Sequence, residues 1–206
     1  GTLLPHSGSS GDSTACSSCG KSYVRSDLQN LVSAAEQNLK TCTEICQSDM
    51  IQGRSTLLRL LETEEFQRLQ PTHHLIYEAN LALAMTARAL SDLEHRPKFL
   101  RAARDSLKAF DKEPSLQLAS LELSLGLALV QQARTGGDQL SPVVGEAKRC
   151  LQTGHEMQVA CLGSESVAAR RSKAALQTLV KNLHGAEEVG PEGLKDMPKL
   201  SLEDEP

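Results

Sequence analysis

The chain has 206 residues, a formal net charge of −4, and only two Tyr, three Phe and no Trp. A nucleic-acid surface combines clustered Lys and Arg with aromatic side chains that stack on bases, so we expect no direct contact with nucleic acid. Because no apolar run is long enough to span a membrane and no signal peptide is visible, we expect no membrane association either. Six cysteines over this length are too sparse for a disulfide scaffold, which favours a cytoplasmic or nuclear location.

The N-terminal segment, residues 1–22, is rich in Gly and Ser and contains the motif Cys16-Ser-Ser-Cys19-Gly20. Two residues between the thiolates allow both sulfurs to reach one ion, and Gly20 suits the turn that follows, as in one half of a zinc ribbon. A tetrahedral site needs four ligands, and the chain has no second motif of this kind. We interpret Cys16 and Cys19 as a zinc half-site, with an unmetallated loop and a redox pair as alternatives.

The residues that follow show helical periodicity. Apolar residues recur at spacings of three and four from Val24, and we expect this first helix to end near Gly53 and the next to begin at a Ser55 cap. Residues 116–129 alternate like a strand, but Leu and Ala are strong helix formers, so we predict a buried helix there. About seven helices are expected in antiparallel succession, the later ones starting at Pro71, Phe99, Pro114, Pro142 and Glu165, with stops at Gly163 and Gly185.

Two of the expected helix pairs show the same small-residue pattern. Leu83-Ala84 and Leu125-Gly126 lie 42 residues apart, each early in a helix. Ala103-x3-Leu107 and Ala147-x3-Leu151 lie 44 residues apart, each in the partner helix. A repeated helix pair with a small residue at the crossing is typical of helical solenoids. We therefore predict an all-α fold over residues 23–184, a right-handed, tetratricopeptide-like array of antiparallel helical pairs.

The other cysteines and histidines are expected to have structural roles. Cys42 and Cys46 share an apolar helical seam and are predicted to pack in the core, as are Cys150 and Cys161. Adjacent helical residues point about 100° apart, so a packing or capping role at a helix start is favoured for the His73-His74 pair over a metal site. We find no phosphate loop, nucleophile elbow or Ser-His-Asp arrangement, and we assign no catalytic residue.

Charged residues form two basic stripes and an acidic tail. Residues 185–206 hold seven acidic residues and two lysines, and this composition predicts a disordered segment. Each basic stripe is interpreted as a solvated face, with docking of an acidic partner segment or of the tail as the alternative. The candidate partner-binding residues are Lys98, Arg101 and Arg104 in one stripe and Arg170, Arg171 and Lys173 in the other.

Several short motifs together resemble one protein family. The chain begins with Gly1-Thr-Leu-Leu-Pro5, followed by a Ser-rich spacer, then Cys16-Ser-Ser-Cys19-Gly20 and a long helix. This order is similar to the region after the catalytic domain in SET- and MYND-domain protein lysine methyltransferases, especially the arthropod-type branch. Leu69-Gln-Pro-Thr-His-His-Leu-Ile76 resembles the start of that family's tetratricopeptide-like helices, and Leu162-Gly-Ser-Glu-Ser-Val167 the turn before its last helix. The sequence departs from the family pattern at Gln70, His74 and Leu162.

The resemblance implies a role that depends on a larger parent enzyme. The SET segment and the MYND zinc module are absent from the 206 residues, so methyl transfer and S-adenosylmethionine binding are expected only in a full-length parent. The remaining zinc ligands are expected before residue 1. The helical region would wall the substrate cleft and bind protein partners. The alternative is a free-standing tetratricopeptide-like adaptor, although Ile76 stands where a carboxylate clamp needs Lys four residues before Asn80.

Overall fold

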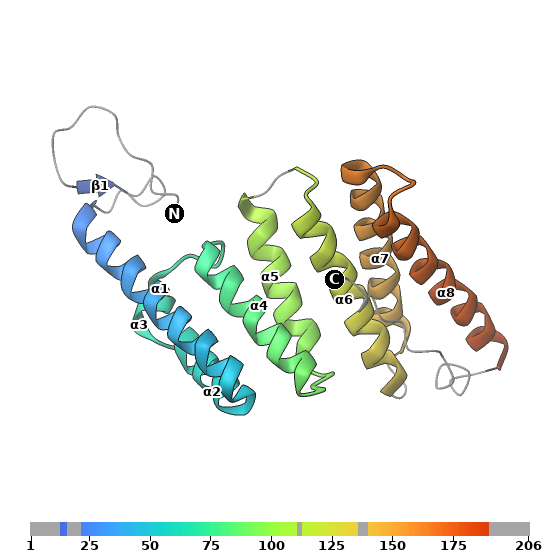
Figure 1. Cartoon of the computed structure of the whole chain (residues 1–206), viewed down its shortest axis with the longest axis horizontal. Coiled ribbons are helices and arrows are strands. Elements are labelled where there is room, and N and C mark those ends of the chain that lie inside the picture. Colours follow the sequence, from blue (N-terminus) through green and yellow to red (C-terminus); the bar gives the residue numbers. More distant parts are fainter. Residues whose placement is uncertain (1–12, 16–21, 111–112, 136–139, 190–206) are drawn as a thin grey trace.

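The computed structural model describes residues 13–15, 22–110, 113–135 and 140–189. Over these residues the protein is all-helical apart from one short hairpin, which confirms the predicted all-α class (Figure 1). The described elements are β1 (Ser13–Ala15), β2 (Ser22–Val24), α1 (Arg25–Ser48), α2 (Met50–Leu61), α3 (Glu64–Arg68), α4 (His74–Ala89), α5 (Arg96–Phe110), α6 (Leu116–Thr135), α7 (Leu140–Leu162) and α8 (Val167–Val189).

The hairpin stands at the start of the array. β1 and β2 pair antiparallel, with Ser13 opposite Val24 and Ala15 opposite Ser22. The sequence pattern did not predict these strands, because three residues are too few to show an alternation of apolar and polar side chains. β2 ends at Val24 and α1 begins at Arg25, so the hairpin continues directly into the first helix (Figure 1).

The first helical pair is divided earlier than predicted. The expected helix end near Gly53 and the cap at Ser55 are both wrong, since α1 ends at Ser48 and α2 begins at Met50. Asp49 between them is extended, with φ −146° and ψ 100°, and its carboxylate accepts hydrogen bonds from the N–H groups of Ile51 and Gln52. Capping by Asp49 explains why the helix breaks there. Gly53 does not end a helix but lies within α2, where a Cβ would lie 2.5 Å from the Cys46 sulfur.

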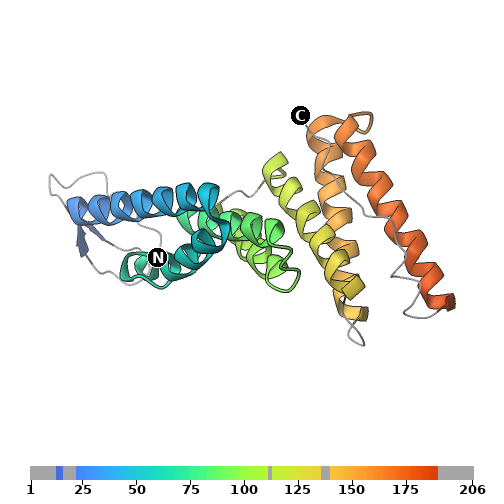
Figure 2. The same ribbon diagram turned by 60° about the horizontal axis from the view of Figure 1, so that its bottom comes forward.

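The remaining helices continue as a row of antiparallel neighbours. α4 packs against α5, α5 against α6, α6 against α7 and α7 against α8 (Figures 1 and 2). The predicted helix stop at Gly163 is confirmed, since Gly163 follows α7 with a φ of +83°. The predicted stop at Gly185 is wrong, because α8 continues to Val189. Residues 190–206 of the expected acidic tail lie outside the described residues.

The core is densest around α6. The leucine-rich segment is helical, as predicted, and most of its side chains are buried. Its crossing with α7 is close at two glycines: a Cβ on Gly126 would lie 2.7 Å from Leu151 Cγ, and one on Gly154 would lie 2.7 Å from Leu123 Cγ. Small residues therefore let the two backbones approach. The buried leucines of α6 are Leu118, Leu121, Leu123, Leu125, Leu127 and Leu129.

Candidate functional site

In the sequence, the two candidate zinc ligands fall between β1 and β2. Cys16 and Cys19 belong to residues 16–21, outside the described residues, and the flanking β1 and β2 bring the two ends of this segment together. Among the described residues, no group of three or more His, Cys, Asp or Glu side chains is gathered in a way that could hold a metal ion.

The cysteines of α1 belong to the core, as predicted. Cys42 is buried and Cys46 is half-buried beneath Gly53 of α2. Burial raises the pKa of both thiols, and for Cys42 the nearby Arg59 only partly opposes this. Because metal ligation and nucleophilic attack require the thiolate, this pair is suited to packing. Cys161, by contrast, is exposed at the end of α7, and its predicted burial is wrong.

The predicted capping role at the start of α4 is also confirmed. His73 is the N-cap residue, and its Nδ1 accepts a hydrogen bond from the Leu75 N–H at 3.3 Å. Burial, together with the adjacent His74, lowers the pKa of His73, which keeps the imidazole neutral and able to accept this hydrogen bond. The two rings lie 4.4 Å apart between centroids. They do not converge with any third ligand among the described residues.

The α5 basic stripe is largely occupied by contacts within the protein. Arg101 makes two parallel hydrogen bonds to Glu146 of α7, from Nε to Oε1 at 2.8 Å and from Nη2 to Oε2 at 2.7 Å. This hydrogen-bonded arrangement holds the pKa of the Glu146 carboxyl below its usual range and raises the pKa of the guanidinium. Arg101 therefore joins two helical pairs through a bidentate ion pair. Lys98, at the start of the stripe, is exposed.

A buried carboxylate lies beneath the same stripe. Glu122 of α6 is only 2% exposed and forms an ion pair with Lys108. Arg104 lies 3.8 Å from Glu122, donates to Asp105 at 3.0 Å, and reaches the Cys150 sulfur at 3.9 Å. Burial, followed by the proximity of Glu122, raises the pKa of the Cys150 thiol to about 12. The stripe thus ends in a polar cluster between α5, α6 and α7.

The charges of this inter-helix cluster balance. The cluster is formed by Arg101, Arg104, Lys108, Asp105, Glu122, Glu146 and Cys150. Three cations face three carboxylates, so it offers no excess positive charge to an acidic ligand. Sequence reasoning identified the arginines but missed their partners on other helices, Glu122 and Glu146, which lie well beyond α5 along the chain. A usable signal was present at Glu122, the one charged residue in the apolar stretch 116–133. A lone acid on such a helix requires a buried partner.

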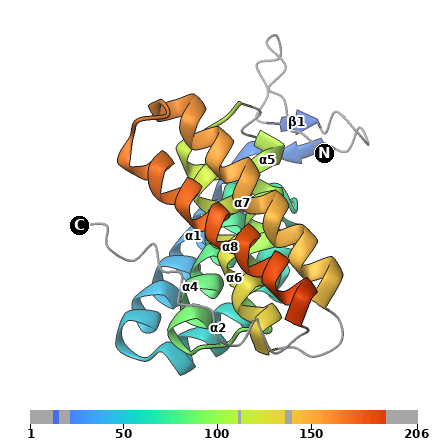
Figure 3. The ribbon, with the colours of Figure 1, turned by 90° about the vertical axis from the view of Figure 1, so that its right-hand side faces the viewer.

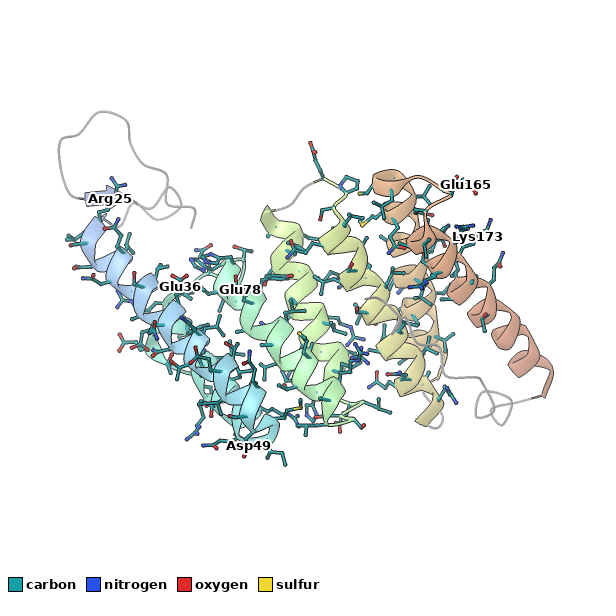
Figure 4. The ribbon with its side chains drawn as sticks, viewed as in Figure 1. Arg25, Glu36, Asp49, Glu78, Glu165 and Lys173 are labelled. Carbon is teal, nitrogen blue, oxygen red and sulfur yellow. The ribbon has the colours of Figure 1, made fainter. Side chains whose placement is uncertain are left out.

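The second basic stripe lies on the last described helix. Arg170, Arg171 and Lys173 of α8 are exposed. The opposite side of α8 is buried against α7 through Ala169, and the buried hydroxyl of Ser172 bonds to Nδ1 of His155 at 2.9 Å. Figure 4 shows Lys173 at the outer edge of the array. The two stripes therefore differ: Arg101 and Arg104 pair with carboxylates of the protein, whereas Arg170 and Lys173 lie on an outer surface.

Comparisons with known proteins add no relative. Neither models of protein families nor a search of curated protein sequences finds a match to this chain. No helix among the described residues is both long and apolar enough to cross a membrane.

Proposed function

We propose that this chain is the C-terminal helical region of a SET/MYND-type protein lysine N-methyltransferase, non-catalytic by itself, which walls the substrate cleft and binds protein partners. The observation that supports this most is the hairpin whose connecting residues hold Cys16 and Cys19 and whose second strand continues directly into α1. A zinc knuckle followed at once by a helical array is the order of elements that the family resemblance implies. Methyl transfer and S-adenosylmethionine binding belong to the full-length parent.

The helical array is proposed to be tetratricopeptide-like and right-handed. The equivalent small residues Ala84 and Gly126 are both buried, as are Ala103 and Ala147 in the partner helices. Small residues at matching sequence positions are thus buried in two successive pairs, α4 with α5 and α6 with α7. Such repetition supports a solenoid in which each pair contacts mainly its neighbours.

The zinc site is proposed to be completed by ligands upstream of residue 1. Cys16 and Cys19 would provide two thiolates, and zinc would close the hairpin as a structural ion. Cys42 and Cys46 are unsuitable for the other two positions, because they are packed between α1 and α2 and their thiol pKa values are raised.

One form of the alternative adaptor function is disfavoured by Asn80. A carboxylate clamp would need this side chain to face a bound peptide. Asn80 is instead 7% exposed, and its Nδ2 donates to the Ile76 carbonyl at 2.8 Å within α4. The side chain is therefore committed to its own helix.

The assignment is tested by the upstream reading frame and by zinc content. We expect a Cys-x2-Cys pair before Gly1 and an Asn-His-Ser-Cys segment further upstream; an initiator Met preceded by neither would contradict the proposal. In a chain extended to include the upstream pair, elemental analysis should find about one zinc per molecule, because a structural site uses four ligands. The 206-residue chain should lose zinc on dialysis.

Matched cysteine variants make the zinc measurement specific. In the extended chain, Cys16→Ser or Cys19→Ser should abolish stoichiometric zinc binding, whereas Cys161→Ser, at an exposed cysteine on α7, should retain it. Tight, stoichiometric zinc in the short chain that survives Cys16→Ser would show that the half-site proposal is wrong.

A further inference from the structure

The outer face of α8 carries basic residues and is not covered by another helix among the described residues. α8 packs against α7 at the end of the array (Figure 3). Its buried side carries the small residues Ala169, Ser172 and Ala175. The exposed positions recur at spacings of three and four, which places them on one stripe opposite the buried side. This stripe holds Val167, Arg170, Lys173, Ala174 and Gln177, and Arg171 beside it is exposed as well.

The charge on this helix has one sign over most of its length. Residues 166–186 contain three basic residues besides Arg170, namely Arg171, Lys173 and Lys181, and no Asp or Glu. Of these residues, Arg170 and Lys173 are exposed. A basic face of one sign attracts an acidic segment, and the attraction is strongest at low ionic strength.

The same chain supplies a segment of opposite charge. Residues 190–206 hold five acidic residues and two lysines, a net charge of −3, with three of the acids at Glu203, Asp204 and Glu205. The nineteen residues of helix between Arg170 and Val189 rise by about 29 Å. The fourteen residues from 190 to 203 reach up to about 46 Å when extended. The acidic end of the chain is therefore long enough to return to Arg170.

We propose that residues 190–206 lie along the basic face of α8, here defined by Arg170 and Lys173, and compete there with acidic segments of other proteins. Because the segment is tethered to the same helix, its effective concentration at this face is in the millimolar range, so several weak ion pairs must act together to hold it. The contact would make the face available only to a partner that binds it more strongly. This inference does not depend on the methyltransferase assignment.

The test compares nuclear magnetic resonance spectra of the full 206-residue chain and two sets of variants. The first set neutralises the segment with Glu203→Gln, Asp204→Asn and Glu205→Gln. The second reverses the face with Arg170→Glu and Lys173→Glu, both at exposed positions where folding should be preserved. We expect both sets to shift the same α8 backbone amides at low salt, and these differences to vanish at about 0.5 M salt, where screening is strong.

A control and a competition measurement distinguish this contact from a general effect of charge and from docking between two copies. Lys40→Glu with Arg59→Glu reverses two exposed charges on α1 and α2 and should leave the α8 amides unchanged. A synthetic peptide of residues 190–206 should bind the segment-neutralised chain at least roughly tenfold more tightly than the wild-type chain, because the tethered segment competes in the latter. Equal affinity for both would overturn the proposal. Amide shifts that disappear on dilution would also overturn it, because they would indicate docking between two copies.

Discussion

Glu122 shows how a single charged side chain connects two neighbouring helices. The carboxylate is 2% exposed in the leucine-rich α6, where an isolated charge would be strongly unfavourable. Lys108 pairs with it from α5, and Arg104 approaches to 3.8 Å. Removing one member of such a pair leaves a buried charge without compensation, which costs more than the pair contributes net. The cluster therefore favours one register of α5 against α6.

Glu146 gives the protein a predictable dependence of stability on acid. Its hydrogen bonds with Arg101 lower the pKa of Glu146 in the folded state. The ionised carboxylate therefore stabilises the fold fully above its pKa in the unfolded chain, about 4.3. This stabilisation is lost as the pH falls through the lower pKa of the folded state. We expect Glu146→Gln to reduce the free energy of unfolding by about 0.5–1 kcal/mol at pH 7, a modest value because the Arg101 side chain is 37% exposed. The difference between variant and wild type should shrink towards pH 3.

Urea denaturation at both pH values checks this prediction. Asp92 also has a lowered pKa, because hydrogen bonds from His95 and the charge of Arg54 outweigh its burial, but it is common to both proteins and cancels in the difference. Glu36→Gln, at an exposed position on α1, serves as the control and should change stability by less than about 0.5 kcal/mol. A Glu146→Gln difference that grew at pH 3 would have the wrong sign for stabilisation by the ionised carboxylate.

At the scale of elements, Asp49 determines where the first helical pair divides. Its carboxylate accepts from the N–H groups of Ile51 and Gln52, both at 3.0 Å, and so caps α2 at the corner labelled in Figure 4. Asp49→Ala should reduce the free energy of unfolding by about 1 kcal/mol, whereas Asp49→Asn, which also caps well, should cost only a few tenths. Thermal denaturation measures both. Equal losses for Ala and Asn would indicate that the charge of Asp49, rather than its capping hydrogen bonds, stabilises this corner.

The crossing of α6 and α7 depends on the absence of a side chain at Gly126. A Cβ there would lie 2.7 Å from Leu151 Cγ and 3.1 Å from the Ala147 carbonyl oxygen. We expect Gly126→Ala to destabilise the protein by about 1–3 kcal/mol through overpacking, as measured by urea denaturation. Gly145→Ala is the matched control, because its Cβ would meet only Arg149 Nη1 at 3.8 Å, and it should stabilise α7 by about 0.5–1 kcal/mol. Two variants of equal stability would contradict the role of Gly126 in the crossing.

At the scale of the whole molecule, the helices form a row in which the middle and the end are stabilised differently. α6 buries six leucines and is covered by α5 and α7, whereas the described buried positions of α8 are Ala169, Ser172 and Ala175. Stabilisation by apolar burial scales with the area removed from water, so the part of α8 whose side chains are described, residues 167–178, contributes less of it than α6. The inter-helix cluster lies between α5, α6 and α7, in the middle of the row. The outer face of α8 is one of the surfaces that the array exposes to solvent.

Much of this architecture could be predicted from local sequence. The all-α class, the helix over the alternating leucines, the stop at Gly163 and the His73 cap all follow from spacing and residue type, and the structure confirms them. The break at Asp49 was misplaced because the apolar seam continues through Cys46 towards Gly53 without a change of period. Periodicity reports which residues face the core, and it does not report where a capping carboxylate interrupts the chain.

The candidate site separates what the sequence determined from what only tertiary structure decided. The sequence by itself determined the helices, the small residues at their crossings and the existence of two basic stripes, because these depend on spacings within one helix. Only the tertiary structure decided that Arg101 meets Glu146, 45 residues away. It also decided that Arg104 and Lys108 approach the buried Glu122. Arg170 and Lys173, by contrast, face outward. The physical reason is that charge pairing depends on which helices become neighbours, and packing across the array establishes those neighbours.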